Sequence, residues 1–466
     1  MATFPSPVMA TMSMRPSPSM SPSATDDPAK PRLPAAGLAT GMFLVPGTEV
    51  SMSDFYQHHL FTTLHRLKRL PLEKLETSLE QAAERRRMAL LLPSLASEMD
   101  GPALPRIIGH LQAVRYLHRI VVALDRASAS DYRRALTFFS DLPQEVTILW
   151  LDGPRATDVF NRFEASGLVK RVHGKGQAVW FALGHLLAAG DCQSVALHDC
   201  DVVTYDRYLL GRLCFPVLRQ DVDFKFAKAY YARTSDRLNG RVTRLFVYPL
   251  LTALRSFFPG QPFLEYLSVF RYPLAGEMAM QLDLARHIRV PSDWGLEVGL
   301  LSEVYRNLSP KEMCQVDVAG RYDHKHQALS IEEPNTGLMR MVKDITSTIL
   351  RALAAEGATI SPEILMSLKA AYLRLAQDYV ERYAFDAAIN GFPFNRDEEE
   401  RAAEAFAESL HVAGEDYLEN ILYTPLLPNW NRMFSALPEA HDWMAEIPAK
   451  DRAAAGERKA TAARQR

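Results

Sequence analysis

Residues 194–203 read Ser-Val-Ala-Leu-His-Asp-Cys-Asp-Val-Val, so four strand-like residues lead into two carboxylates, Asp199 and Asp201. An apolar run that opens onto acidic residues is typical of a buried strand ending at a site. Because residues i and i+2 of a strand point to the same face, Asp199 and Asp201 are predicted to face one cation. Oxygen ligands favour Mg²⁺ or Mn²⁺, and such a cation would hold a diphosphate.

The same spacing recurs at Asp221-Val222-Asp223, so spacing alone identifies no site. With 23% charged residues in the chain, an Asp-x-Asp triplet arises readily by chance. The two copies differ in context, because Asp199 follows an apolar run whereas Asp221 follows the polar pair Arg219-Gln220. A metal site and a pair of solvated carboxylates both remain open readings of the first triplet.

Composition limits the classes of protein to which the chain can belong. Its 466 residues, 48% of them hydrophobic, suffice for two or three domains with sizeable cores. Lys and Arg (53) nearly balance Asp and Glu (55), so no basic field indicates nucleic acid as a partner. The sequence shows no signal peptide and no apolar run of about 18 residues, and four cysteines without C-x-x-C spacing indicate reduced thiols. We therefore expect a cytoplasmic protein that binds neither nucleic acid nor membranes.

The middle of the chain alternates apolar strand patterns with helical patterns. Strands are predicted at 88–93, 120–124, 146–151 and 194–197, with Asp125, Asp152 and Asp199 following three of them. Strands that alternate with helices predict an α/β fold with a mainly parallel sheet flanked by helices. Ligands of such a sheet bind beyond the carboxyl ends of the strands, where these aspartates fall.

The flanks of this α/β domain have other compositions. Residues 1–40 are rich in Pro, Ser, Ala and Met and are predicted to be a disordered tail. Leucine spacing predicts N-terminal helices over 53–86, divided at Pro71. Residues 337–447 form a predicted helical C-terminal region whose Leu and Tyr stripes favour helix packing or a homodimer surface. Residues 448–466, rich in Ala, Lys and Arg, are predicted to be a second disordered tail.

Two glycine-flanked basic stretches are candidate anion sites. Gly174-Lys175-Gly176 places a lysine between glycines at the predicted start of a helix, and Gly240-Arg241-Val242-Thr243-Arg244 leads into another helix. Glycine lets the backbone approach a ligand, and helix starts favour negative charge. Flexible turns with solvated basic side chains are the alternative reading of both. Glu297 and the loop 321–327, which holds His324, are weaker candidates by themselves.

Taken in order, these stretches resemble the retaining glucosyl-3-phosphoglycerate synthases, nucleotide-sugar glycosyltransferases of the GT-A fold, over about residues 88–327. The resemblance implies a domain at 87–330, with a nucleotide-sugar half (87–204) and an acceptor half (205–330). It implies metal ligation by Asp199, Asp201 and His324. The remaining implied contacts are to the donor (Pro93, Leu95, Glu98, Asp125, Ser128, Lys175, Asp199), to the acceptor (Gly240, Arg241, Thr243, Arg321, Lys325) and around the transferred sugar as catalytic residues (Leu274, Gly276, Glu297).

The activity implied by the resemblance is transfer of glucose from a nucleoside diphosphate-glucose to 3-phosphoglycerate with Mg²⁺ or Mn²⁺. The family has Arg two residues before its His, where this chain has Tyr322, with Arg321 and Lys325 alongside. These neighbouring basic groups take over the acceptor contact, or the enzyme prefers unphosphorylated glycerate. A non-catalytic nucleotide-sugar sensor that docks a partner through its C-terminal helices is the alternative from another class.

Overall fold

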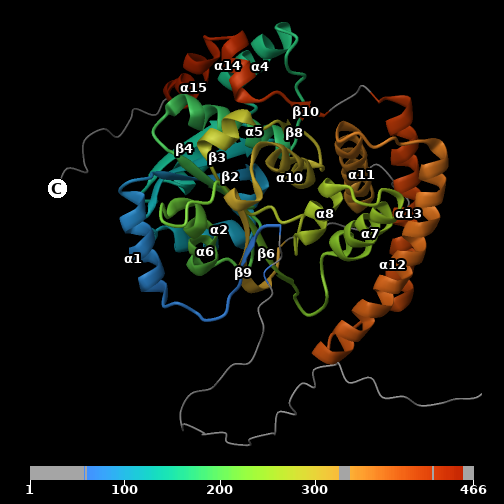
Figure 1. Cartoon of the computed structure of the whole chain (residues 1–466). Helices are drawn as coiled ribbons and strands as arrows, with labels where there is room; N and C mark the ends of the chain where they lie inside the picture. The colour runs from blue at the N-terminus through green and yellow to red at the C-terminus, as the bar shows by residue number, and fades with distance from the viewer. Residues whose placement is uncertain (1–56, 58–59, 325–335, 422–424, 455–466) are drawn as a thin grey trace, which may run out of the picture. The chain divides into compact units, whose positions relative to one another are not determined.

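One eight-stranded sheet organises the part of the chain that the computed structural model describes, which is residues 57, 60–324, 336–421 and 425–454 (Figure 1). The strand order is β1-β9-β6-β7-β5-β2-β3-β4. Only β7 runs antiparallel to its neighbours in this sheet, which confirms the mainly parallel α/β fold. The strands are β1 (Thr62–Leu64), β2 (Met88–Leu95), β3 (Leu117–Asp125), β4 (Glu145–Trp150), β5 (Ser194–Leu197), β6 (Phe226–Arg233), β7 (Met278–Gln281) and β9 (Met313–Tyr322).

Helices lie on both sides of the sheet. In the view of Figure 1, α4, α5 and α15 lie above the strands, and α1, α2 and α6 lie below them. The central strands are apolar along almost their whole length, because both of their faces are covered. The helices of this part are α1 (Leu72–Ala83), η1 (Ala96–Asp100), α2 (Ala103–Leu111), α3 (Ala129–Phe138), α4 (Pro154–Ala165), α5 (Lys175–Ala189), α6 (Arg207–Leu218), η2 (Thr243–Val247), α7 (Tyr248–Phe257), α8 (Pro262–Val269), α9 (Leu282–His287), α10 (Leu296–Asn307) and η3 (Pro310–Glu312).

The carboxyl ends of the parallel strands place acidic residues along one edge, as the sequence predicts. Strands β2, β3, β4 and β5 are mutually parallel, with Leu95 opposite Asp125 in the register. Asp125 ends β3, Asp152 follows β4, and Asp199 follows β5. Carboxylates far apart in the sequence therefore lie at the edge where ligands of such sheets bind.

The prediction of two N-terminal helices over residues 53–86 is right for the second helix and wrong for the first. Its second helix is α1, whose Leu75 and Leu79 are buried against α6. In the described part of its first half, Thr62–Leu64 forms the edge strand β1, paired in parallel with β9. Two β-branched threonines favour a strand, and the open edge of β9 supplies partners for their backbone groups.

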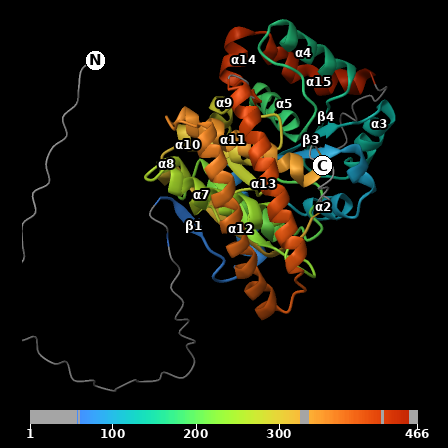
Figure 2. The same cartoon turned by 90° about the vertical axis from the view of Figure 1, so that its right-hand side faces the viewer.

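Three long helices follow the sheet: α11 (Gly337–Ala355), α12 (Pro362–Asn390) and α13 (Arg396–Glu419). Figure 2 shows α11, α12 and α13 side by side, in agreement with the contacts of α13 with the other two. Helix α12 also packs on α7 and on η2, where the buried Tyr372 hydroxyl donates to the Leu245 carbonyl of η2 at 2.8 Å. The helical C-terminal region thus covers the segment that follows the Gly240 turn.

After these helices the chain forms a separate two-stranded sheet and then packs near β4. Strand β10 (Leu426–Leu427) pairs with β8 (Val290–Pro291), and Trp430, in α14 (Trp430–Ala436), stacks on Trp180 with ring centroids 4.4 Å apart. The predicted tail 448–466 is wrong for its first part, because helix α15 (Ala440–Ala454) continues through it. Ile447 and Asp451 are buried, and Arg452 donates to the Val146 carbonyl at 2.7 Å, so this turn is held against β4. The remainder of that tail, like residues 1–40, lies outside the described residues.

Two further predictions concern the described residues. All four cysteines are buried and unpaired, as predicted. None of the described helices is long and apolar enough to cross a membrane.

Candidate active site

Lys175 begins α5, directly after Gly174. The following Gly176 packs against the backbone of β8, and a Cβ there would lie 1.8 Å from the Pro291 carbonyl oxygen. The second glycine is therefore required by close packing, and the reading of this stretch as a flexible turn is wrong. This packing fixes where the lysine side chain leaves the helix.

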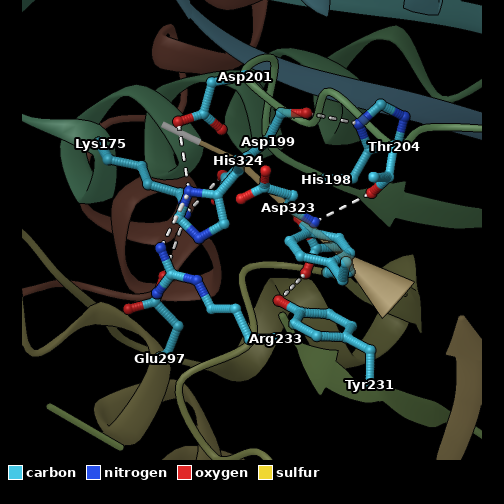
Figure 3. Close-up of polar contacts among 12 residues, drawn as sticks. Lys175, His198, Asp199, Asp201, Thr204, Tyr231, Arg233, Glu297, Asp323 and His324 are labelled. Atoms are coloured by element: carbon cyan, nitrogen blue, oxygen red, sulfur yellow. Dashed lines mark hydrogen bonds and ion pairs between the residues drawn. The ribbon is translucent and has the colours of Figure 1, made fainter. Parts of the chain in front are cut away.

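The Lys175 ammonium is held between two carboxylates that come from distant elements. Its Nζ lies 2.6 Å from Asp199 Oδ1 and donates to Glu297 Oε1, in the first turn of α10, at 3.0 Å (Figure 3). Burial favours the neutral amine, but the two carboxylates outweigh it and raise the pKa of Lys175 above its ordinary value. The lysine is therefore a fixed positive charge at the end of β5.

Asp201 meets a segment from the far end of the sheet. Val202 forms an isolated antiparallel bridge with His324, and the Val203 amide donates to the Asp323 carbonyl at 3.0 Å. These contacts bring His324 Nδ1 to 3.6 Å from Asp201 Oδ2. The other oxygen, Asp201 Oδ1, is buried and has no hydrogen-bond partner among the described residues.

The prediction that Asp199 and Asp201 share one face of a strand is wrong in its geometry. Strand β5 ends at Leu197, two residues before Asp199. The carboxylate of Asp199 pairs with Lys175, whereas that of Asp201 lies beside His324. Beyond Leu197 the chain leaves the sheet and bends at Cys200, so its side chains no longer alternate as in a regular strand.

The segment before β7 closes around Asp199. A Cβ on Gly276 would lie 2.5 Å from Asp199 Oδ2 and 2.9 Å from Lys175 Nζ, so only glycine leaves room for the ion pair. The next residue, Glu277, is fully buried and accepts hydrogen bonds from the Tyr231 and Tyr322 hydroxyls. Burial, together with the nearby Asp199 carboxylate, raises the pKa of Glu277.

A second basic group lies across from this cluster. Gly240 adopts a positive φ of 71°, which glycine tolerates best, and turns the chain into η2, where Thr243 is buried. Arg241 points to α13, with its Nη2 2.8 Å from Glu399 Oε1 and 3.5 Å from Glu398 Oε2. The charge of Arg241 is therefore largely compensated within the protein.

One pocket of about 650 Å³ joins the two sides. Its lining contains Lys175, Asp199, Asp201, Leu274, Gly276, Glu297 and His324 together with Gly240, Arg241 and Thr243. Figure 3 shows Asp199 and Asp201, from the segment after β5, converging with Lys175 of α5, Glu297 of α10 and His324 after β9. A carboxylate oxygen without a hydrogen-bond partner beside an imidazole fits a divalent cation, and the lysine fits an anionic group next to it.

Comparison with known proteins identifies the family. No family model matches the chain. It is 42% identical to glucosyl-3-phosphoglycerate synthase of Persephonella marina, over 86% of this chain and 99% of that protein. It is 39% identical to the protein of the same name from Methanococcoides burtonii, over 84% and 96%. The chain belongs to the glucosyl-3-phosphoglycerate synthase family.

Solved structures of members of the glucosyl-3-phosphoglycerate synthase family are more distant. One is the Mycobacterium tuberculosis enzyme in complex with Mn²⁺, uridine-diphosphate-glucose and phosphoglyceric acid. It is 22% identical, with a TM-score of 0.46 over 63% of this chain and 88% of that one.

Several residues assigned from the family pattern lie outside the pocket. Arg321 is exposed, and its Nε donates to the Thr234 carbonyl at 3.3 Å. Tyr322 is buried against Glu277, and Lys325 lies outside the described residues. Of the two basic neighbours expected to take over from the family arginine, Arg321 is therefore not found in the pocket.

The predicted nucleoside contacts gather next to the pocket, at the ends of β2 and β3. Pro93 and Leu95 end β2, Glu98 lies in η1, and Asp125 ends β3. His173 Nδ1 lies 3.7 Å from Asp125 Oδ1 and 3.9 Å from Asp152 Oδ1. The Ser128 hydroxyl caps α3 by accepting from the Asp131 amide. The nucleoside role of these residues stays a prediction.

Sequence reasoning missed Arg233, which also lines the pocket. Its signal was present, because Tyr231 and Arg233 share one face of β6, and Arg233 stands at the carboxyl end of that strand. A basic residue at that position of a parallel strand faces the ligand edge.

Proposed function

We propose that the chain is a metal-dependent retaining glucosyltransferase that moves glucose from a nucleoside diphosphate-glucose to the 2-hydroxyl of 3-phosphoglycerate. The observation that carries the proposal is the single pocket that joins Lys175, Asp199, Asp201 and His324 to the Gly240 turn. Relatives of that name, about 40% identical over nearly their whole length, support the same reaction.

The donor side of the pocket suits a sugar diphosphate. Asp201 and His324, with Asp199 alongside, hold Mg²⁺ or Mn²⁺ in this proposal, because Asp201 Oδ1 is a buried acceptor without a donor among the described residues. Bound there, the cation supplies charge stabilisation to the diphosphate that leaves. Lys175 adds a second positive charge, fixed in advance by Asp199 and Glu297.

The carboxylates of the pocket are arranged for positioning rather than for attack on the sugar. Glu297, which lines the pocket, accepts from Lys175 and is held by that donor. The nearby Glu277 is fully buried, does not line the pocket, and accepts from two tyrosines. A double displacement needs a carboxylate nucleophile at the sugar carbon. We therefore favour attack by the acceptor 2-hydroxyl on the face that the diphosphate leaves, with a donor phosphate oxygen accepting the proton.

The direct test is a product assay with purified protein and Mg²⁺. The protein is incubated with UDP-, GDP- or ADP-glucose and either 3-phosphoglycerate or glycerate, and released nucleotide and glycoside are measured. We expect turnover with 3-phosphoglycerate, retention of the anomeric configuration, and loss of turnover with a chelator. Metal-dependent donor binding without turnover on either acceptor would instead identify a nucleotide-sugar sensor.

We also propose that the protein is a homodimer that uses α12. Two large apolar side chains of this helix, Phe385 and Ile389, are 65% and 86% exposed. Neighbouring exposed apolar side chains of this size are typical of an interaction surface. Light scattering of the wild-type protein should give twice the mass of one chain, and the Ile389→Glu variant should have the mass of a single chain. A monomeric wild-type protein would refute this part of the proposal.

A further inference from the structure

Arg233 is a partly buried cation on the wall of the pocket. Its Nη1 donates to the Tyr272 hydroxyl at 3.5 Å, and its Nη2 lies 3.4 Å from His324 Nδ1 (Figure 3). Its Nε is buried and has no hydrogen-bond partner among the described residues. The guanidinium of Arg233 is thus held in position while its Nε–H remains a donor without an acceptor among the described residues.

No carboxylate of the described residues lies within ion-pair distance of Arg233. The other arginines of the pocket differ, because Arg241 pairs with Glu399 at 2.8 Å and Arg237 pairs with Asp236 at 3.2 Å. A partly buried charge without a counter-ion is costly, and an anionic ligand would remove that cost. Arg233 is therefore the pocket arginine whose charge is available to a ligand.

The position of Arg233 indicates which ligand this is. Its Cδ lies 3.5 Å from the place of a Cβ on Gly240, so its stem runs along the turn that contains Thr243. Its partner in the β6–β9 register is Tyr322, whose hydroxyl turns away to Glu277. Lys175, another cation of the pocket, is paired with Asp199 and Glu297 and lies on the donor side. The uncompensated charge therefore lies on the acceptor side, between the Gly240 turn and His324.

We propose that Arg233 binds the phosphate of the acceptor and makes the enzyme selective for 3-phosphoglycerate over glycerate. The inference rests on the proposed function and adds a residue to its acceptor site. A phosphate monoester carries about −1.5 to −2 charges at pH 7 and three acceptor oxygens, which suit the fork of a guanidinium. A carboxylate is present in both acceptors, so it cannot distinguish them.

The test compares Arg233→Gln with Arg237→Gln, which removes an exposed and already paired guanidinium from the same pocket. Calorimetry on protein saturated with UDP and Mg²⁺ measures binding of 3-phosphoglycerate, glycerol 3-phosphate and glycerate. We expect Arg233→Gln to weaken both phosphorylated ligands by at least about thirtyfold, as for loss of a charge-assisted contact. Glycerate binding should change less than about threefold, and Arg237→Gln should change none of the three by more than that.

Two outcomes would overturn the inference. Equal weakening of glycerate and 3-phosphoglycerate would mean that Arg233 binds the carboxylate or only supports the pocket. Unchanged 3-phosphoglycerate binding would mean that it contacts no acceptor. Should Arg233→Gln fail to fold, Arg233→Lys decides, because a point charge should keep part of the preference for phosphate. If the wild-type protein transfers no glucose but binds its ligands, the proposed function fails, whereas the binding series still tests Arg233.

Discussion

Two Asp-x-Asp triplets of this chain have the same spacing and opposite surroundings. Asp221 and Asp223 are exposed and paired with surface arginines, Asp221 with Arg219 and Asp223 with Arg86 at 2.9 Å. In the first triplet, Asp199 is held by Lys175 at 2.6 Å, and Asp201 has a buried oxygen without a partner among the described residues.

The difference comes from the element that precedes each triplet. Asp199 follows β5, a central strand whose carboxyl end opens into the pocket. Asp221 follows the last turn of α6, in a surface turn where Asp223 has a positive φ of 49°. An Asp-x-Asp triplet is thus a candidate ligand set where it follows a strand of the sheet, and a solvated turn where it follows a helix. Four substitutions test this contrast.

The largest effect is expected from Asp201→Ala. Removal of the Asp201 carboxylate should abolish cation-dependent donor binding and lower kcat/KM by about a thousandfold or more, because charge stabilisation of the leaving diphosphate is lost. Donor binding is measured by calorimetry with and without Mg²⁺. Asp221→Ala is the matched control and should leave both quantities unchanged. Equal losses in the two variants would refute the assignment of the first triplet.

A methyl group at Gly276 should act on the first triplet from the opposite side. Its Cβ would lie 2.5 Å from Asp199 Oδ2, so Gly276→Ala must displace the Asp199–Lys175 pair. We expect kcat/KM to fall by about a hundredfold, comparable to the loss of one preorganised donor. Gly109→Ala, with no atom within 4 Å of the added methyl group, is the control. Wild-type activity of Gly276→Ala would show that the ion pair is dispensable.

His324→Ala should weaken the site without abolishing it. Two carboxylates remain for the cation, so we expect its affinity to fall by about tenfold and activity to recover at higher Mg²⁺ or Mn²⁺ concentration. Activity titrations with each ion measure this shift. If no concentration restores activity, His324 does more than support the cation.

The smallest effect is expected in the second triplet. Asp223→Ala removes a surface ion pair with Arg86 and a hydrogen bond from Gln281, so the free energy of unfolding should fall by less than about 1 kcal/mol. Urea unfolding measures that loss, and kcat/KM should not change. A change in donor binding would indicate that this turn communicates with the pocket.

The central strands and the long helices could be predicted because their signals are local. Four predicted strands correspond to β2, β3, β4 and β5, and the predicted helical region 337–447 contains α11, α12 and α13. Prediction failed where a distant partner decides the conformation. Thr62–Leu64 is a strand because β9 has an open edge, and residues 448–454 are helical because they pack near β4.

The sequence by itself determined the α/β class, the order of the motifs and the residue types of the site, since apolar periodicity and glycine-flanked charges act over a few residues. Only the tertiary structure decided which charges remain available. Three pocket cations, Lys175, Arg233 and Arg241, look alike in the sequence. Lys175 and Arg241 are paired with Glu297 and Glu399, each more than a hundred residues away along the chain, whereas Arg233 has no carboxylate partner among the described residues. Ion pairs between residues that are distant in the sequence leave no local sequence pattern. The reason is that charge compensation depends on the distance between side chains in space and not on their separation along the chain.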